Sequence, residues 1–482
     1  MTSPPVVAAT NLASIPLWLV TETSYVSWLA EQPVAIRNWL FAQRFKPERS
    51  RALAWSDAEG TPRGAVLGLG NLVDVNSLSC WHTAGMTDRL PGACYRIATP
   101  LAPRAGYQAA LGWWLGHYRS GLYKPQPPAQ MAASGLQAVQ GVTLECPPGV
   151  DLDRLRITVE SQHWARDLIN TPAGDLGPEE LAAQATALAQ EHGAEISVTV
   201  GEALLANNYP LIHAVGRASS RAPRLIDLRW RGVAAGKDSG VPQRRVTLVG
   251  KGVCFDTGGL DLKASAGMAL MKKDMGGAAV ALGVARIVMS ERLPIELRVL
   301  IPAVENSVAG NAMRPGDVLR SRRGLTIEVG NTDAEGRLIL ADALTAADAE
   351  QPDLLLDFAT LTGAARVALG PELPAVFTDD AGLRQSILDC ADHEQDPVWP
   401  LPLWDSYDEE LASRIADLGN VASHGMAGAI FGALFLRRFV SRGRRWAHFD
   451  LYAWNSRERA GRPVGAEAQC MRLAASLIRN SL

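Results

Sequence analysis

Residues 325–347 read LTIEVGNTDAEGRLILADALTAA, and this stretch carries both a fold signal and a chemical signal. The apolar run at 325–330 favours a β-strand, and the Leu- and Ala-rich run from Leu338 favours an α-helix. Asp333 and Glu335 are therefore expected where a strand passes into a helix, with Arg337 two residues further on. Open α/β sheets bind ligands at this end of their strands, and carboxylates bunched there need a cation because like charges resist ionisation.

Apolar runs of the strand and helix types alternate on both sides of this stretch. Strands are expected at 196–200, 211–215, 225–230, 246–249, 297–301, 325–329, 354–358 and 446–451. Helices are expected at 178–191, 276–290, 338–350, 383–392 and 427–440. Strands with helices between them predict an α/β fold whose mixed, mainly parallel sheet is flanked by helices.

The chain of 482 residues is too long for one ordinary core, which predicts more than one domain. Its first 125 residues hold seven of the 13 tryptophans, and the Pro-rich segment Lys124–Gln130 is typical of an exposed loop. We expect a smaller, Trp-rich N-terminal α/β domain at 1–150. A linker helix at 151–172 would join it to a larger catalytic domain at 173–482.

Composition excludes several function classes. A net charge of −3 gives no electrostatic case for binding nucleic acid or an anionic membrane. Six cysteines without a C-x-x-C pair argue against a zinc ribbon and a disulfide scaffold. The first charged residue is Glu22, so no basic leader precedes an apolar segment, and the apolar run at 425–436 is too short to span a bilayer. We expect a cytoplasmic protein.

Two further acidic motifs follow predicted strands or start predicted helices. Lys251 and Asp256 lie in VGKGVCFDTGGLDLK at 249–263, whose glycines do not match either of the two common phosphate-binding loops. Asp274 lies in MKKDMGGAA at 271–279. Each acid alone is explained as a helix N-cap or as a charge that favours the helix dipole. Acids in three separate loops together favour two divalent metal ions, with Zn²⁺, Mn²⁺, Co²⁺ and Mg²⁺ all open.

These motifs resemble those of the leucyl aminopeptidases of the M17 type, which are cytosolic dinuclear-metal exopeptidases. The octapeptide NTDAEGRL at 331–338 reads as the signature of that family, and the two acidic motifs match two others. RDLINTP at 166–172, RPGD at 314–317 and TLTGA at 360–364 extend the resemblance, which covers about residues 151–460.

The resemblance implies roles for particular residues. One metal ion would be held by Lys251, Asp256, Asp274 and Glu335, and the other by Asp256, Asp333 and Glu335. Lys263 would be the electrophilic lysine, and Arg337 would hold a bicarbonate ion that acts as general base. The pocket for the first substrate side chain would be formed by Met271, Thr360 and Gly363, with Leu361 lending a backbone carbonyl.

The implied function is a metal-dependent aminopeptidase that removes N-terminal residues from peptides, preferring apolar ones such as Leu. A metal-bridging water or hydroxide would attack the peptide bond. Zn²⁺ or Mn²⁺ is the metal expected first, and the family resemblance implies a homohexamer built as a dimer of trimers. The alternatives are a narrower dipeptidase, for instance on Cys-Gly, and a moonlighting DNA-binding or scaffold protein. A pseudoenzyme is disfavoured because all seven catalytic-site residues are present.

The chain departs from the family pattern in three places. Cys254 and Thr257 replace residues of similar size. Tyr452, in WAHFDLYAW at 446–454, stands where a small residue is usual, and this makes the substrate preference an open question. In the same segment, His448 is flanked by aromatic residues and is expected to be a buried structural histidine rather than a metal ligand.

Overall fold

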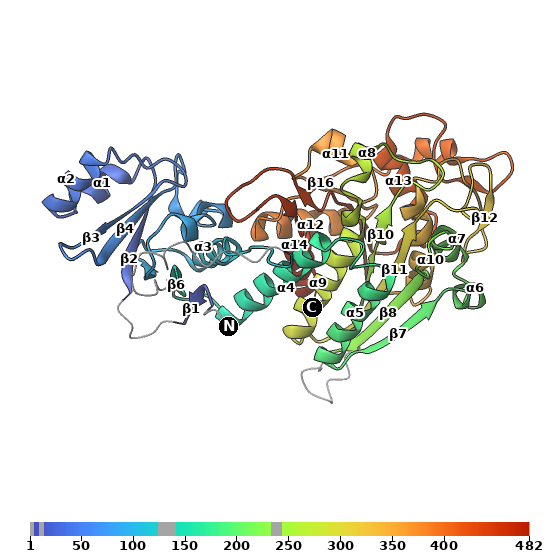
Figure 1. The fold of residues 1–482 in the computed structure, drawn as a ribbon, viewed down its shortest axis with the longest axis horizontal. Helices are drawn as coiled ribbons and strands as arrows, with labels where there is room; N and C mark the ends of the chain where they lie inside the picture. The colour runs from blue at the N-terminus through green and yellow to red at the C-terminus, as the bar shows by residue number, and fades with distance from the viewer. Residues whose placement is uncertain (1–3, 9–13, 124–140, 233–242, 482) are drawn as a thin grey trace. The chain divides into compact units, whose positions relative to one another are not determined.

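The computed structural model describes residues 4–8, 14–123, 141–232 and 243–481, and its ribbon is shown in Figure 1. The chain forms two compact units, residues 1–163 with 456–464 and residues 164–455 with 465–482. The division falls inside helix α4 (Leu152–Asn170), and the domain limits at 150 and 172 stay predictions. The predicted loop at Lys124–Gln130 lies outside the described residues.

None of the helices in the described ranges is long and apolar enough to cross a membrane.

The first unit is built on a sheet whose described strands follow the order β1-β6-β5-β2-β4-β3. Neighbouring strands are parallel except for the hairpin of β3 and β4. The strands are β1 (Val6–Val7), β2 (Ile15–Val20), β3 (Ala52–Ser56), β4 (Pro62–Gly68), β5 (Cys94–Ile97) and β6 (Thr143–Glu145). The helices are α1 (Tyr25–Ala30), α2 (Val34–Ala42) and α3 (Pro103–Leu115).

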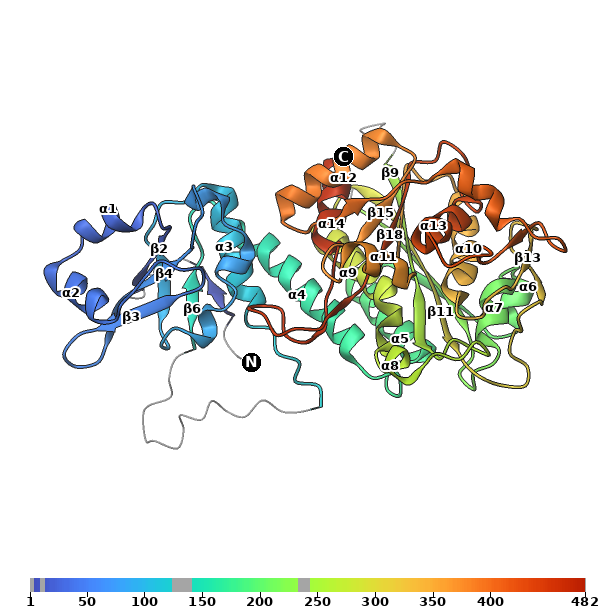
Figure 2. The same ribbon diagram turned by 90° about the horizontal axis from the view of Figure 1, so that it is seen from above.

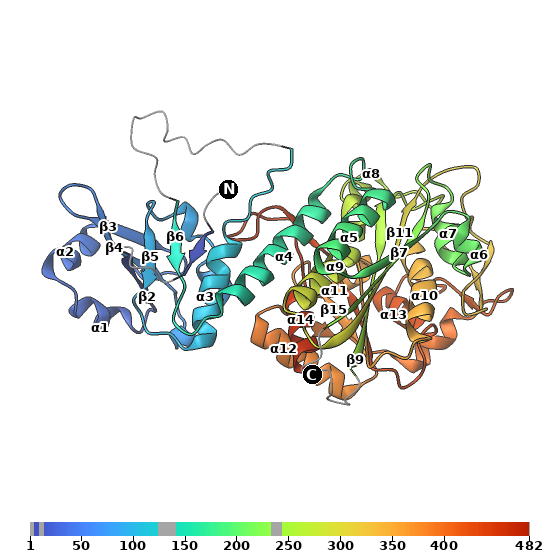
Figure 3. The ribbon, with the colours of Figure 1, turned by 90° about the horizontal axis from the view of Figure 1, so that it is seen from below.

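The two faces of this sheet have different cores because side chains alternate along each strand. Leu17 and Leu19 of β2 pack in one core with Trp113 of α3. Trp18 and Val20, which point to the other face, join an aromatic cluster that includes Trp28 of α1. Figure 3 shows the sheet with α3 and the α1–α2 pair at separate positions around it. All seven early tryptophans therefore serve as core or half-buried packing residues rather than forming a local motif; they are Trp18, Trp28, Trp39, Trp55, Trp81, Trp113 and Trp114.

The second unit is built on a sheet whose described strands follow the order β16-β15-β18-β14-β9-β11-β8-β7, with β10 pairing β11 off this path. Its central strands β18, β14, β9 and β11 are parallel, and antiparallel strands β15 and β8 join at the two sides. The strands are β7 (Glu195–Val200), β8 (Arg224–Arg231), β9 (Arg244–Gly250), β10 (Gly252–Asp256), β11 (Ile295–Asn306), β14 (Leu354–Ala359), β15 (Ala375–Phe377), β16 (Trp399–Pro400) and β18 (Trp446–Asp450).

Helices cover both faces of this sheet, as Figure 2 shows. One group consists of α5 (Pro178–His192), α9 (Gly276–Ser290), α12 (Ala381–Glu394) and α14 (Met471–Asn480). The other group consists of α7 (Pro210–Gly216), α10 (Glu335–Asp348) and α13 (Gly428–Arg437). Shorter helices are α6 (Ala203–Ala206), α8 (Ser265–Met268) and α11 (Gly363–Leu369). The predicted α/β class, with a small N-terminal sheet and a larger, mainly parallel mixed sheet, is confirmed.

Two of the predicted strands differ in the structure: one run forms a helix, and the other forms a strand outside the main sheet. The prediction for 211–215 is wrong, because this run forms α7. Pro210 occupies the first turn of that helix, and the carboxylate of Asp342 accepts hydrogen bonds from the amides of Leu211 and Ile212 at its start. The strand predicted at 325–329 exists as β13 (Thr326–Glu328), but in a small separate sheet with β12 (Val318–Arg320) and β17 (Leu418–Gly419).

Candidate metal centre

The acidic residues singled out in the sequence meet at the carboxyl end of the central strands. Lys251 directly follows β9, and Asp256 is the last residue of β10. Asp274 lies in a 3₁₀ segment, Met271–Met275, immediately before α9, and Glu335 is the first residue of α10. The short strand β13 is not part of the main sheet, but the turn after it still brings Asp333 to the same place.

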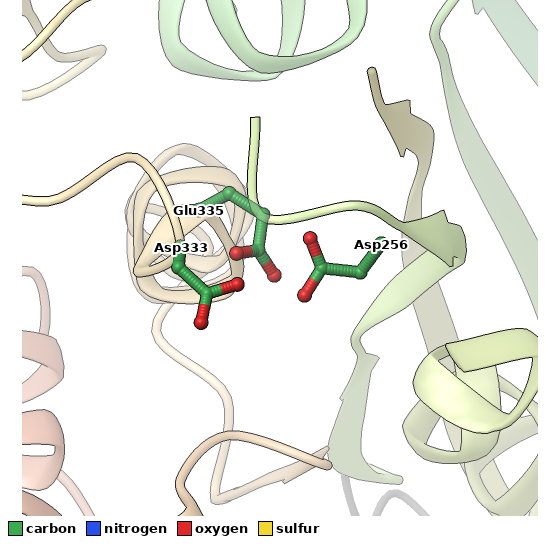
Figure 4. A group of neighbouring side chains, drawn as sticks. All are labelled: Asp256, Asp333 and Glu335. Atoms are coloured by element: carbon green, nitrogen blue, oxygen red, sulfur yellow. The ribbon is translucent and has the colours of Figure 1, made fainter. Parts of the chain in front are cut away.

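Three carboxylates converge closely enough to share a cation. One ligand oxygen from each of Asp256, Asp333 and Glu335 can be chosen so that all three lie within 4.8 Å of one another. Figure 4 shows the three side chains pointing toward one another from β10, from the turn before α10 and from the first turn of α10. Asp256 and Glu335 are buried, whereas Asp333 is partly open to solvent.

Two lysines are interleaved with the carboxylates. Lys251 Nζ lies 2.8 Å from Asp274 Oδ2 and 3.0 Å from Glu335 Oε1, and it donates a hydrogen bond of 3.1 Å to the carbonyl oxygen of Thr360. Lys263 Nζ lies 2.8 Å from Asp256 Oδ2 and also contacts Asp333. Four carboxylates thus face two ammonium groups among the described residues, which leaves an excess of negative charge in a buried place.

The pKa values reflect this excess. Burial, together with the nearby Asp256 carboxylate, raises the pKa of Glu335 to about 8. The same two causes raise the pKa of Asp333 to about 6, and burial raises the pKa of Asp274. Burial opposes the charge on Lys251, but Asp274 and Glu335 outweigh it and raise the pKa of that lysine. The cluster therefore resists holding all its negative charge until a further cation arrives.

The N-cap explanation of Asp274 is wrong, and Asp333 and Glu335 are not N-caps either, although Glu335 lies in the first turn of α10, where a negative charge favours the helix dipole. The residue that caps α9 is Met275 and the residue that caps α10 is Ala334, and neither helix start receives a side-chain cap. Asp274 instead accepts a 2.7 Å hydrogen bond from the Thr360 hydroxyl and pairs with Lys251. Glu335 Oε2 is buried and has no hydrogen-bond partner in the described part of the chain. A buried carboxylate oxygen left in this way fits a metal ligand better than a structural acid.

Local backbone features hold the cluster together. A Cβ atom at Gly336 would lie 2.6 Å from Lys251 Cε and 2.7 Å from Nζ, so only glycine lets this lysine approach the helix start. Asn306, at the end of β11, donates hydrogen bonds to Asp256 Oδ1 at 2.9 Å and to the carbonyl of Thr332 at 3.1 Å. Sequence reasoning missed Asn306, whose signal was a polar residue at the end of a long apolar strand.

Arg337 lies two residues after Glu335 in the first turn of α10 and is buried. One of its terminal nitrogens donates a 2.6 Å hydrogen bond to the carbonyl of Asn420, while its Nε has no partner among the described residues. Burial lowers the pKa of Arg337 to about 10, so the group stays charged at neutral pH. A buried guanidinium with donors to spare is suited to binding a planar anion.

A cavity of about 560 Å³ opens onto this cluster. It is lined by the predicted metal and catalytic residues except Glu335, which reaches the cluster from the helix start. The four predicted pocket residues, Met271, Thr360, Leu361 and Gly363, also line it, together with Tyr452. The structure thus brings every site residue predicted from the sequence to one cavity or to its edge.

Asp450 supports the Leu361 side of the cavity, and sequence reasoning missed it. Its carboxylate accepts hydrogen bonds from the amides of Leu361 and Thr362, at 3.1 and 3.2 Å, and from the Thr362 hydroxyl at 2.6 Å. Two residues earlier on β18, His448 is fully buried and its Nδ1 lies 2.5 Å from Asp357 Oδ1. The prediction that His448 is a structural histidine agrees with this pairing.

Comparisons with known proteins identify relatives over most of the chain. The model of the cytosol aminopeptidase family, catalytic domain (Peptidase M17), matches residues 163–474. A probable cytosol aminopeptidase of Geobacter sp. (strain M21) is 38% identical over 431 residues, covering 86% of this chain and 85% of the relative. The Mycobacterium marinum protein of the same name is 40% identical over 376 residues, covering 77% of this chain and 72% of that protein.

Solved structures resemble the whole chain. The crystal structure of a cytosol aminopeptidase from Coxiella burnetii has 40% sequence identity and a TM-score of 0.88, covering 98% of this chain and 99% of its own. The bottromycin maturation enzyme BotP, in complex with Mn, has 30% identity and a TM-score of 0.83, covering 97% of this chain and 99% of its own.

Proposed function

This chain belongs to the cytosol aminopeptidase family, M17, and from that premise we propose that its cavity removes the N-terminal residue of peptides by metal-dependent hydrolysis. The observation that carries the proposal is the buried excess of carboxylates at the end of the central strands. The relatives are named cytosol aminopeptidases, and we propose the same activity and the cytosol as the location of this chain.

We propose that the cluster holds two divalent ions. Lys251, Asp256, Asp274 and Glu335 would bind one ion, and Asp256, Asp333 and Glu335 the other. The unpartnered oxygen of Glu335 and the convergence of three carboxylates support this assignment. The Mn-bound BotP makes Mn²⁺ a reasonable first choice, and Zn²⁺ fits the same ligands with Co²⁺ and Mg²⁺ as further possibilities. When bound, such ions supply a water of lowered pKa and polarise the substrate carbonyl.

Lys251 can bind a metal ion only as a neutral amine, because an ammonium group has no lone pair to offer. The surrounding carboxylates raise the pKa of Lys251, so a cation that binds at Lys251 must displace a proton. Metal uptake should therefore release protons and weaken as the pH falls. This coupling is a property of the ligand set itself and does not depend on which divalent ion occupies the site.

Lys263 and Arg337 would serve the reaction in different ways. Lys263 presents its ammonium group beside Asp256 and Asp333, where negative charge would develop on the attacked carbonyl oxygen. Arg337 would hold a bicarbonate ion, whose oxygens can accept a proton from water. The free Nε of Arg337 supports that role. The carbonyl of Leu361, held in place through Asp450, would align the peptide.

We propose a homohexamer, a dimer of trimers, as the assembly. This follows the family resemblance, and sedimentation should give a mass about six times that of the 51.6 kDa chain. The dipeptidase and DNA-binding alternatives have no observation in their favour. A substrate panel that includes Cys-Gly and a gel shift at moderate salt test them, and the net charge of −3 predicts no retardation of DNA.

Hydrolysis of a leucine anilide before and after chelation tests the proposed function. The rate should vanish on chelation and return when Mn²⁺ or Zn²⁺ is added. Lys263→Ala should abolish the restored rate while circular dichroism shows an intact fold, and Arg384→Met, an exposed substitution on α12, should match the wild type. Full activity of the chelated protein would refute the proposal.

A further inference from the structure

Two cationic side chains on the wall of the cavity have no role in the proposed hydrolysis. Lys273 and Arg366 line the same cavity as Met271, Thr360 and Gly363. Both approach the ring of Tyr452: Lys273 Nζ lies 4.6 Å from the ring centroid, and Arg366 Cζ lies 4.9 Å from it. Tyr452, the aromatic residue that departs from the family pattern, is therefore the residue that both cationic side chains contact.

Neither cation has an acidic partner. Within the described part of the chain, the Lys273 ammonium and the Arg366 guanidinium make no ion pair and no hydrogen bond, and the Tyr452 ring is the group that both contact. Asp274 and Asp450 act on the charge of Lys273 only from beyond ion-pair distance. The other two lysines of the cavity, Lys251 and Lys263, each contact two carboxylates. Lys273 is 5% exposed, so water compensates its charge poorly. An aromatic ring face attracts a cation, but a carboxylate attracts the cation more strongly, and its oxygens accept hydrogen bonds from the N–H groups of the cation.

The remaining groups on this wall offer little to a neutral polar side chain. The Thr360 hydroxyl already donates to Asp274 Oδ1, and Met271 and the Tyr452 ring are largely apolar. An aliphatic side chain can lie against that apolar surface. A side chain that also ends in a carboxylate would add charge-assisted hydrogen bonds to Lys273 and Arg366, whereas a basic side chain would be repelled by both.

We propose that Lys273 and Arg366, gathered at Tyr452, are specificity-determining residues that favour substrates whose N-terminal residue is acidic, Glu or Asp. The inference rests on the proposed function, because it takes the wall of Met271, Thr360 and Gly363 as the pocket for the first side chain. It extends the substrate range beyond leucine and predicts discrimination against N-terminal Lys and Arg.

Glutamyl and glutaminyl anilides test the charge alone, since their side chains have nearly the same shape. The metal-loaded wild type should show a kcat/KM at least about tenfold higher for the glutamyl substrate, as expected for one hydrogen bond between charged groups. Arg366→Met should lower this ratio, and Lys273→Met with Arg366→Met should bring it near one. Arg366 is exposed, so its substitution leaves the core packing in place.

The matched control is Arg384→Met, which removes an exposed arginine from α12, outside the cavity, and should leave the ratio at the wild-type value. A wild-type ratio of one or less, or a ratio that Arg366→Met does not change, would overturn the inference. The leucine anilide separates the two proposals. If the leucine anilide is hydrolysed and the glutamyl anilide is not preferred over the glutaminyl anilide, only the proposed specificity is overturned. If none of the three anilides is hydrolysed, the proposed function is overturned as well.

Discussion

Two charged clusters lie at opposite ends of the same central strands, and they differ in whether their charges balance. The proposed metal centre, called the metal centre below, follows the carboxyl ends of β9 and β10. Near the amino ends of β9 and β11, an arginine cluster lies beside a cavity of about 480 Å³. Arg229 and Arg298 pair with the carboxylates of Glu350 and Asp227, the Arg245 guanidinium donates to the carbonyl oxygen of Glu350, and the Arg245 amide donates to the Asp353 carboxylate.

The arginine cluster satisfies its charges internally. Arg298 binds Asp227 through two hydrogen bonds of 2.7 and 3.0 Å, and Arg229 lies 2.6 Å from Glu350. Burial opposes the ionisation of Glu350, but Arg229 and Arg298 hold its pKa below the usual value. In the metal centre the pKa of Glu335 rises instead, to about 8. A cluster that balances its own charge is explained by stability, whereas a buried cluster that does not balance its charge points to a ligand.

The largest expected effect is on activity at the metal centre. Glu335→Ala should lower kcat/KM for a leucine anilide at least about a thousandfold, because it removes the side chain that we propose as a ligand of both metal ions. The thermal midpoint of the metal-free protein should not fall, since the substitution relieves repulsion among buried carboxylates. Differential scanning fluorimetry after chelation measures this, and a drop of several degrees would mean that Glu335 is a structural acid.

The next largest effect is on stability at the arginine cluster. Arg298→Met should destabilise the protein by about 3 kcal/mol, because it leaves the largely buried Asp227 carboxylate with only the 3.4 Å contact to the exposed Arg229. Activity per folded molecule should stay at the wild-type level. Adding Asp227→Leu to this variant should recover part of the loss, as both charges are then gone. A denaturant titration of the three proteins decides it, and loss of activity in the folded single variant would contradict the structural role.

Asp342 is an intermediate case, an acid held by backbone amides. It accepts hydrogen bonds from Leu211, Ile212 and Arg322, yet burial prevails and raises its pKa to about 7. An unfolded aspartate ionises near pH 4, so the folded state keeps a proton that the unfolded state loses between about pH 4 and 7. The contribution of Asp342 to stability is therefore greatest at low pH and declines as the pH rises toward 7.

Asp342→Asn removes this titration. The free energy of unfolding of the wild type minus that of the variant should fall by about 1 kcal/mol per pH unit between pH 5 and 7, and it should level off above that range. Thermal midpoints measured side by side at several pH values provide the test, because the other titrating groups are common to both proteins. A difference that grows with pH would show that the amide donors, rather than burial, control this carboxyl.

The smallest effect is expected at the exposed rim of the arginine cluster. Arg231 pairs with Glu296 at 2.7 Å, but its side chain is 75% exposed. Arg231→Ala should change stability by less than about 0.5 kcal/mol, since solvent screens the pair. Chemical denaturation measures the change, and a loss comparable to that of Arg298→Met would show that exposure does not separate the two pairs.

Local sequence patterns sufficed to predict the elements whose stabilising interactions are local. Helix α9 has the bounds predicted, 276–290, because its apolar spacing is continuous between a glycine pair and Glu291. The residues of the octapeptide converge with Asp256 because strand ends meet at one edge of a sheet. The run at 211–215 was misassigned because the acid that stabilises its helical start, Asp342, lies 131 residues from Leu211.

The supporting residues of the site depend on contacts of the same long-range kind. Asn306 reaches Asp256 across 50 residues, and Asp450 reaches Leu361 across 89. Each is a polar residue at the end of a mostly apolar strand, a pattern that many structural residues share. The ion pairs of the arginine cluster could not be predicted from the sequence either, because they join residues of β8, β11 and the segment after α10.

Titration of the chelated protein with Mn²⁺, by calorimetry with metal analysis of the final sample, tests the central comparison most directly. The wild type and Arg298→Met should each bind about two ions per chain, with release of protons as Lys251 becomes a ligand. Glu335→Ala should bind fewer ions and bind them weakly. A wild type that binds no divalent ion, or a Glu335→Ala variant that binds as many as the wild type, would contradict the assignment of the unbalanced cluster as the metal centre.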